Sequence, residues 1–535
     1  MDRQTGNNKY KNTAGVIYGI GEWIVLILGL IITLGVGVLQ IFFYVHTYLG
    51  DMSIDYRSNA VLWTIGGCIA EFLVLYALRG VLARIPDRKL FLVLSVLYIA
   101  AGLFLIFSCD SGTVSDAGML THHAQLMNAG DYQGLDPGHY LDLNPVQLGF
   151  LSYERIVLAL FHTTRAMFIL NLMWTLVQDW ALWKIISLYS DDPRVRNLTI
   201  LLSFLFLPSW FLILFAYGLT PGFSCLLAGT YLILRFLKKG GAAACAGGLA
   251  FTALACVMKN NYLIGAVALG VLVLAEFLRR CSGTGENSGD SKKKGPAILL
   301  LIPALVLTAV VPMKGIEAGY RSVSGRNFDH GEPISSYIAM GLHWNDGVPA
   351  GGYDGFNFDN YYAAGFSTEE ADRRAKADIA ERVNFFREHP AYTASFFAHK
   401  LVWTWCEPVY GTVVIGPIEC LGLHTYNAIA QSFYTDGWAL ILAERMMNSL
   451  NVLIFIGSGL YLITGKFVKK RRLEPWELLP FIYLIGGFLF HLVSETKPHY
   501  VETYVVGLLP AAAVMLVRGW DGVSERAGFS GCRKN

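Results

Sequence analysis

Charged residues are scarce in this chain. They make up 15% of its 535 residues, and apolar residues make up 54%, whereas soluble domains contain about a quarter charged residues. This composition excludes a soluble enzyme. A dozen apolar runs, long enough to cross a hydrocarbon core of about 30 Å as helices, predict an integral membrane protein instead. The strict alternation typical of an outer-membrane β-barrel is missing.

Cysteine motifs and several enzyme signatures are also absent. The nine cysteines form no C-x-x-C pair and no Cys/His cluster, so we expect small hydrophobic residues, no zinc site and no disulfide framework. The chain has no Walker loop, G-x-S-x-G or H-E-x-x-H motif, which leaves ATP-driven transport and those hydrolase reactions without support. We expect no cofactor and no nucleic-acid partner. The net charge of +2 says nothing about nucleic acid, because the placement of the charges reports orientation in the membrane instead.

The apolar runs predict twelve membrane helices with both termini on one side. The runs lie near residues 21–46, 59–79, 89–109, 166–189, 198–217, 221–237, 242–258, 261–279, 296–313, 442–465, 476–493 and 500–518. In this arrangement the connections rich in Lys and Arg all fall on the side of the termini, which is cytoplasmic by the positive-inside rule. The expected fold is therefore an all-α, multi-pass protein of the cell membrane, with the first helix retained.

Two long connections are predicted to face outward, and they divide the chain into five parts. These parts are the N-terminal transmembrane helices (1–108), an acidic loop with an interfacial helix (109–165), a transmembrane bundle (166–313), a large extracytoplasmic loop (314–441), and the C-terminal helices with a cytoplasmic tail (442–535). Pro145–Phe161 combines an N-terminal proline with an apolar and a charged stripe, which favours a helix lying in the interface. Ser395–Trp405 is predicted to be a second interfacial helix, and Thr368–Arg387 a helix of the large loop.

Two charged residues mark the outward ends of predicted helices. Asp116 is predicted to cap a short helix at the mouth of the bundle, where it is either an N-cap alone or a reactive carboxylate. Lys259 ends the run 242–258 beside two asparagines. An ammonium there suits a phosphate in the outer leaflet, although a snorkelling lysine would have the same position in the sequence.

Two further groups are candidates for substrate contacts. The short connection Ser494–Tyr500 places an acid, a cation, a histidine and a phenol together, and it either lines a cavity or forms a solvated turn. In the large loop, His343, Trp344 and Asp346 combine rings with a carboxylate. This composition is typical of carbohydrate recognition, and we assign these three residues to substrate binding, although a folded outer cap would have the same composition.

These elements resemble the GT-C membrane glycosyltransferases of the protein O-mannosyltransferase and aminoarabinose-transferase superfamily (family 39-like). The resemblance runs from about Cys109 to Leu516 and implies a GT-C-like bundle. It implies that Asp116 is the catalytic base. The family's helix-end lysine corresponds to Lys259, and Lys497 and His499 are further candidates for contacting the donor phosphate. The motif that opens the interfacial helix and the motif before the last helix imply four more substrate-binding residues, namely Asn144, Gln147, Glu495 and Tyr500.

The implied reaction is the inverting transfer of a hexose or pentose from a polyprenyl-phosphate carrier to an acceptor hydroxyl at the outer membrane surface, with no obligatory metal. Many relatives carry a second acid in the next outer loop, where Tyr217–Pro221 has none. Two alternatives remain open. One is a lipid-linked sugar flippase or transporter that uses Glu71, Asp179 and Glu276 as pathway residues. The other is a ligase-type or polymerase-type transferase that takes a pyrophosphate donor.

Overall fold

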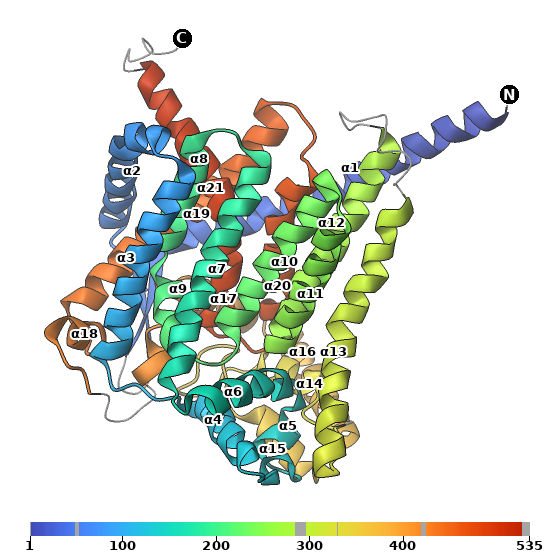
Figure 1. The fold of residues 1–535 in the computed structure, drawn as a ribbon, viewed down its shortest axis with the longest axis vertical. Coiled ribbons are helices and arrows are strands. Elements are labelled where there is room, and N and C mark those ends of the chain that lie inside the picture. The colour runs from blue at the N-terminus through green and yellow to red at the C-terminus, as the bar shows by residue number, and fades with distance from the viewer. Residues whose placement is uncertain (1, 49–52, 284–295, 329, 419–423, 527–535) are drawn as a thin grey trace.

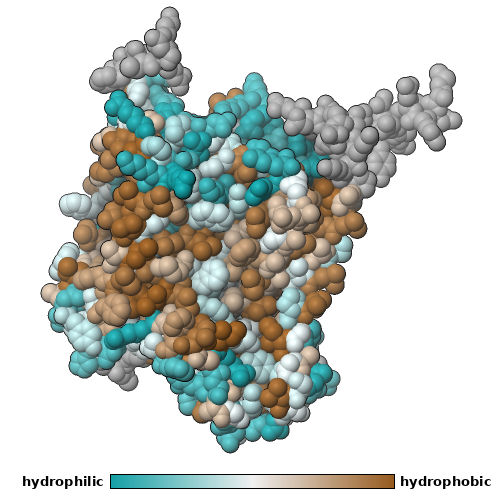
Figure 2. All heavy atoms as spheres, viewed as in Figure 1, coloured by the Kyte–Doolittle hydropathy of each residue, from teal (hydrophilic) through white to brown (hydrophobic). Residues whose placement is uncertain are grey.

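The computed structural model describes residues 2–48, 53–283, 296–328, 330–418 and 424–526, and helices make up most of it (Figure 1). Within these ranges the strands are one hairpin, β1 (Phe43–Thr47) paired with β2 (Ile54–Ser58). On the face shown in Figure 2, an apolar belt covers the middle and hydrophilic residues gather at both ends. The protein is an all-α, multi-pass membrane protein, as its composition predicts.

Nine helical stretches of the described chain are long and apolar enough to cross a membrane. They belong to α1 (Asp2–Phe42), α2 (Val61–Arg84), α3 (Asp87–Ser108), α10 (Leu219–Lys239), α12 (Leu263–Ser282), α13 (Leu301–Ser324), α19 (Trp438–Ile463), α20 (Pro475–Val493) and α21 (Glu502–Arg526). Two bent pairs raise the number to eleven. One pair is α6 (Leu148–Phe161) with α7 (Arg165–Tyr189). The other pair is α8 (Pro193–Leu205) with Leu207–Leu214, which includes α9 (Leu207–Phe211). The remaining predicted span is α11 (Ala242–Met258), a shorter apolar helix.

The segment predicted to lie in the interface turns sharply away from the helix that follows it. A 3₁₀ turn at Pro145–Gln147 opens α6 (Leu148–Phe161), and the axis then bends by 117° into α7 (Arg165–Tyr189). His162 ends α6 in the left-handed conformation, at φ 53°. Ile156 and Leu160 stay exposed on α6, as expected for a helix that rests on lipid.

The first and ninth predicted spans have the wrong ends. The first was predicted to reach residue 46, but α1 ends at Phe42 and β1 follows, because Val45 donates its N–H to the carbonyl of Cys406 at 3.1 Å and packs beside it. The ninth was predicted to end at residue 313, but α13 continues to Ser324. A Lys314–Glu317 ion pair of 2.7 Å, one turn apart, supports this extension.

The two ends of the bundle differ in what they carry (Figure 1). The first described residues of α1 and the last of α21 lie at one end, called here the terminal end. The opposite end, called the loop end, carries the short helices of the two long connections. These are α4 (Ser115–Asn128), α5 (Tyr140–Leu143), α14 (Ile334–Met340), α15 (Phe356–Ala363), α16 (Thr368–Glu388) and, from the loop end into the bundle, α17 (Pro390–Trp405). The predicted helix Thr368–Arg387 is confirmed as α16.

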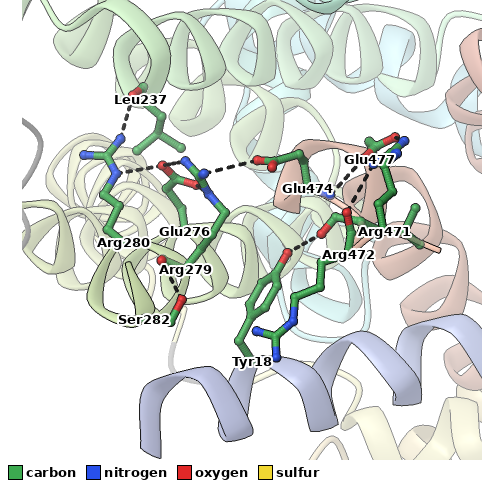
Figure 3. Close-up of polar contacts among 11 residues, drawn as sticks. Tyr18, Leu237, Glu276, Arg279, Arg280, Ser282, Arg471, Arg472, Glu474 and Glu477 are labelled. Carbon is green, nitrogen blue, oxygen red and sulfur yellow. Dashed lines mark hydrogen bonds and ion pairs between the residues drawn. The ribbon is translucent and has the colours of Figure 1, made fainter. Parts of the chain in front are cut away.

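An ion-pair network closes the terminal end (Figure 3). Glu276, on the last turns of α12, pairs with Arg279 at 2.8 Å and with Arg280 at 2.7 Å. Arg279 also reaches Glu474, before α20, at 3.4 Å. Glu276 was a candidate pathway residue of a transporter, but these contacts make it one anchor of a network that ties α12 to α20.

Cysteine-scanning accessibility tests the orientation of the two ends. In a background without the nine native cysteines, an impermeant maleimide added outside is expected to label cysteines placed at residues 116, 346 and 500. It should label cysteines at 293 and 470 only after the membrane is opened, because the basic connections remain in the cytoplasm. Residue 293 lies outside the described residues. Cytoplasmic labelling of residue 116 would contradict this orientation.

Candidate functional site

Tyr217 is the centre of a polar cluster at the loop end, in the connection between α9 and α10. Its hydroxyl donates to Asp116 Oδ2 at 3.0 Å and accepts from Gln147 Nε2 at 2.8 Å. The hydroxyl of Tyr140, on α5, lies 3.1 Å away. Tyr217 is buried, whereas Asp116 is exposed. The cluster therefore holds a carboxylate in a fixed orientation while leaving it open to a substrate.

Asp116 is not the N-cap that the sequence predicts. The cap position of α4 is Val114, without a side-chain cap, and Asp116 lies in the first turn. Its carboxylate is oriented by Tyr217 across 101 positions of sequence, a contact that local pattern does not show. Ser115, between the two, has φ 47°, a left-handed conformation that non-glycine residues adopt at a cost of about 1 kcal/mol or more. Such strain is often found at functional sites.

Lys259 lies buried against this cluster. It follows the last residue of α11, is 8% exposed, and places its ammonium 3.4 Å from the centroid of the Tyr217 ring. Burial lowers the pKa of Lys259 to about 7, although the nearby carboxylates of Asp116 and Glu495 act in the opposite direction. A snorkelling lysine would extend into water, so its position indicates a role inside the site.

The connection before α21 lies beside the same cluster. Burial raises the pKa of Glu495, and the neighbouring charge of Lys497 opposes this shift. Burial also raises the pKa of Tyr500, as do the charges of Glu495 and Asp116. His499 is buried against Phe215, with ring centroids 5.9 Å apart. Residues predicted separately from two distant loops therefore meet at one place.

Lys400, on α17, anchors this connection. Its side chain is fully buried, and its ammonium donates to the carbonyl of Ser494 at 2.8 Å and to the carbonyl of Gly341. Burial lowers the pKa of Lys400 to about 7. A Cβ at Gly341 would lie 2.2 Å from the carbonyl carbon of Ser494, so this close approach requires glycine. The amide of Glu495 then donates to the carbonyl of Tyr337 at 2.8 Å.

Of the three residues of the large loop that were assigned to substrate binding, His343 and Trp344 make contacts within that loop. His343 lies between Asp354 and Asp378, at 2.8 Å and 2.9 Å. Trp344 packs on His399, with ring centroids 4.8 Å apart, and Asp346 is exposed in a turn. The contacts of His343 and Trp344 hold the loop together, as expected of an outer cap.

His343 gives the stability of this loop a pH dependence. Burial alone would lower its pKa, but the hydrogen bonds to Asp354 and Asp378 raise it to about 9. Because the folded pKa exceeds the unfolded value of about 6.5, the stabilisation is complete below pH 6.5 and is lost as the pH rises through about 9. We expect the difference in Tm between wild type and His343→Gln to shrink from pH 6 to pH 9.5. An equal difference at both pH values would contradict this account.

Several residues of the site carry no signal in the sequence. Tyr217 and Tyr140 belong to the Asp116 cluster. A second group adjoins it, in which the hydroxyl of Tyr337 donates to Glu332 and lies 3.3 Å from Asn144 Oδ1. Each is an ordinary residue of a loop or short helix when read along the chain. Asn144 is the exception, because the resemblance assigned it to substrate binding as part of the motif that opens the interfacial helix.

The described residues contain no group of three or more His, Cys, Asp or Glu side chains arranged to hold a metal ion. A scan against protein-family models and a search of curated proteins both find no match to this chain.

Proposed function

We propose that this protein is a membrane glycosyltransferase that moves a sugar from a polyprenyl-phosphate carrier to an acceptor hydroxyl at the extracytoplasmic surface. One observation carries the proposal: an exposed, oriented carboxylate at Asp116 lies close enough to the ammonium of Lys259 to affect its pKa, and the charge of Lys497 acts on the same ammonium, all at one end of a helical bundle. Such a transfer needs a base for the acceptor and cations for the leaving phosphate.

The chemistry divides between these two sides. Asp116 takes the proton of the acceptor hydroxyl while the acceptor oxygen forms its bond to the anomeric carbon. The bond from that carbon to the phosphate oxygen breaks, with inversion, and its electron pair leaves on the polyprenyl phosphate. Lys259 and Lys497 stabilise the charge that develops on this phosphate. Tyr217 and Gln147 orient the base and remain unchanged.

Apolar space inside the bundle supports a lipid-linked donor. A mainly apolar cavity of about 100 Å³ lies among α7, α10, α12, α20 and α21. Phe223 lines this cavity and also a smaller one, which extends to His499 and Glu502. The apolar interior thus leads toward the connection that carries Lys497, where an isoprenoid phosphate would end.

Donor turnover by the purified protein tests the proposal. Radiolabelled polyprenyl-phosphate hexoses and pentoses are incubated with the protein in the presence of EDTA. Water alone or one of a panel of hydroxyl compounds serves as the acceptor, and the released polyprenyl phosphate is measured. We expect release from at least one donor, and its loss in Asp116→Asn. Release from pyrophosphate donors alone would indicate a ligase-type enzyme. Transbilayer movement of the donor in proteoliposomes without turnover would indicate a flippase.

A further inference from the structure

Two buried oxygen atoms beside the Asp116 cluster have no hydrogen-bond donor within the described part of the chain. They are Asn357 Oδ1 and Glu495 Oε1, and each of these residues is 7% exposed. Buried acceptors without donors are costly and uncommon in folded proteins. The region around them therefore favours a ligand that brings several donor groups.

Glu332 brings a second carboxylate to this region. The loop before α14 docks on the motif that opens the interfacial helix, where the amide of Glu332 donates to the carbonyl of Leu143 at 3.0 Å. The preceding Gly331 has φ 138°, and a Cβ there would lie 2.9 Å from Cδ of Pro145. Glycine is required for this close approach, so Gly331 helps to fix the position of Glu332 against the interfacial helix motif.

The carboxylate of Glu332 is held at one oxygen and open at the other. Oε2 accepts from the hydroxyl of Tyr337 and from Nδ2 of Asn357, the latter at 2.8 Å. The described residues supply no donor to Oε1. Burial raises the pKa of Glu332, and the charge of Asp116 adds to this shift, so the two carboxylates lie near one another.

An exposed ring adjoins these carboxylates. Tyr353 is 51% exposed, and its pKa is raised by burial and by the charges of Asp116, Glu332 and Glu495. The ammonium of Lys497 lies 5.1 Å from the ring centroid. The ring therefore lies near both the proposed phosphate side of the site and the acids, where it offers a flat apolar surface.

We propose that Glu332, Asn357 and Tyr353 form a subsite for a hydroxyl-bearing sugar ring, with Glu332 Oε1 and Asn357 Oδ1 accepting from ring hydroxyls and Tyr353 packing on the ring face. The inference rests on the proposed function. The ring belongs either to the transferred sugar or to a sugar-type acceptor, and separate KM measurements distinguish these two sources.

Glu332→Gln and Tyr353→Leu test this subsite. Gln keeps the size of Glu and can still accept from Tyr337, and the Tyr353 ring is exposed enough to be removed without loss of folding. We expect each variant to raise the KM for one sugar-bearing substrate by about 10-fold or more, in line with the cost of leaving substrate hydroxyls unpaired. A rise for the donor assigns the ring to the transferred sugar, and a rise for the acceptor assigns it to the acceptor.

Two controls separate this inference from the proposed function. Glu369→Gln and Tyr362→Leu change exposed residues of the same loop and should leave both KM values unchanged. The rise in Tm caused by sugar-free polyprenyl phosphate should be the same in Glu332→Gln, Tyr353→Leu and wild type. If wild type transfers sugar and both variants match it, the subsite is wrong while the proposed function stands. If wild type neither turns over any donor nor is stabilised by the carrier, both are wrong.

Discussion

Asp116→Asn is expected to lower turnover by about 10²-fold or more, in line with the usual contribution of a general base. Asn keeps an oxygen that accepts from the Tyr217 hydroxyl, so the orientation of the side chain is retained while the proton acceptor is lost. The variant should melt close to wild type, because loss of a charge in the first turn of a helix costs about 0.3–1 kcal/mol. Donor turnover and Tm are measured on the same preparations.

Two neighbouring acids provide matched controls for Asp116. Asp110 lies 3.6 Å from Arg165 in an exposed pair, and Asp131 accepts from the amide of Gln133 at 2.9 Å. Each has a local partner away from Tyr217, so Asp110→Asn and Asp131→Asn should keep most of the activity. If Asp116→Asn melts normally and also keeps most of its activity, Asp116 is not the base.

Lys259→Met is expected to raise the KM for the lipid donor by roughly 10-fold or more. Hydrogen bonds to charged groups contribute about 1.5–3 kcal/mol, and Met fills the space of the buried stem without supplying a charge. The donor phosphodiester keeps its charge across neutral pH, so the titration of Lys259 controls the pH dependence of donor binding. With a folded pKa of about 7, donor affinity in the wild type is highest below pH 7 and falls as the pH rises above it.

The pH profile of donor KM distinguishes a phosphate contact from a structural role of Lys259. In Lys259→Met, the rise in KM above pH 7 should be absent, whereas a structural defect would move KM equally at all pH values. Lys376→Met is the control, because Lys376 is exposed on α16, where it pairs with Asp372 at 2.6 Å. If Lys259→Met has the donor KM and the pH profile of wild type, Lys259 does not contact the donor phosphate and its role is structural.

The sequence was a good guide to features that depend on local composition. Apolar runs located the membrane helices, because a segment that crosses lipid must satisfy its backbone hydrogen bonds internally, as a helix does, and must present apolar side chains to the lipid. The proline and the two-sided pattern of Pro145–Phe161 indicated a helix that lies apart from the next span, and the structure bends there by 117°. Asp116 was identified as a carboxylate at the start of a short helix in the first outer loop, and Lys259 because positive charge is scarce at the outward ends of the predicted spans.

Local pattern failed where a distant segment decides the conformation. The predicted first helix continued to residue 46, but pairing of β1 with β2 and the contact of Val45 with Cys406 hold that stretch as a strand. Asp116 resembled an N-cap, yet its partner is the hydroxyl of Tyr217. Glu332 had no recognisable motif, although the structure brings its carboxylate close enough to Asp116 for the charge of Asp116 to raise the pKa of Glu332.

The sequence by itself determined the class of the protein and several of its reactive groups, because hydrophobicity and charge act residue by residue wherever the chain meets lipid or water. Tertiary structure alone decided which of these groups meet. Lys259 and Glu495 come from connections more than 200 positions apart, and they lie close enough for Glu495 to affect the pKa of Lys259. Such proximity depends on how the helices pack and on buried anchors such as Lys400, and no single segment encodes it.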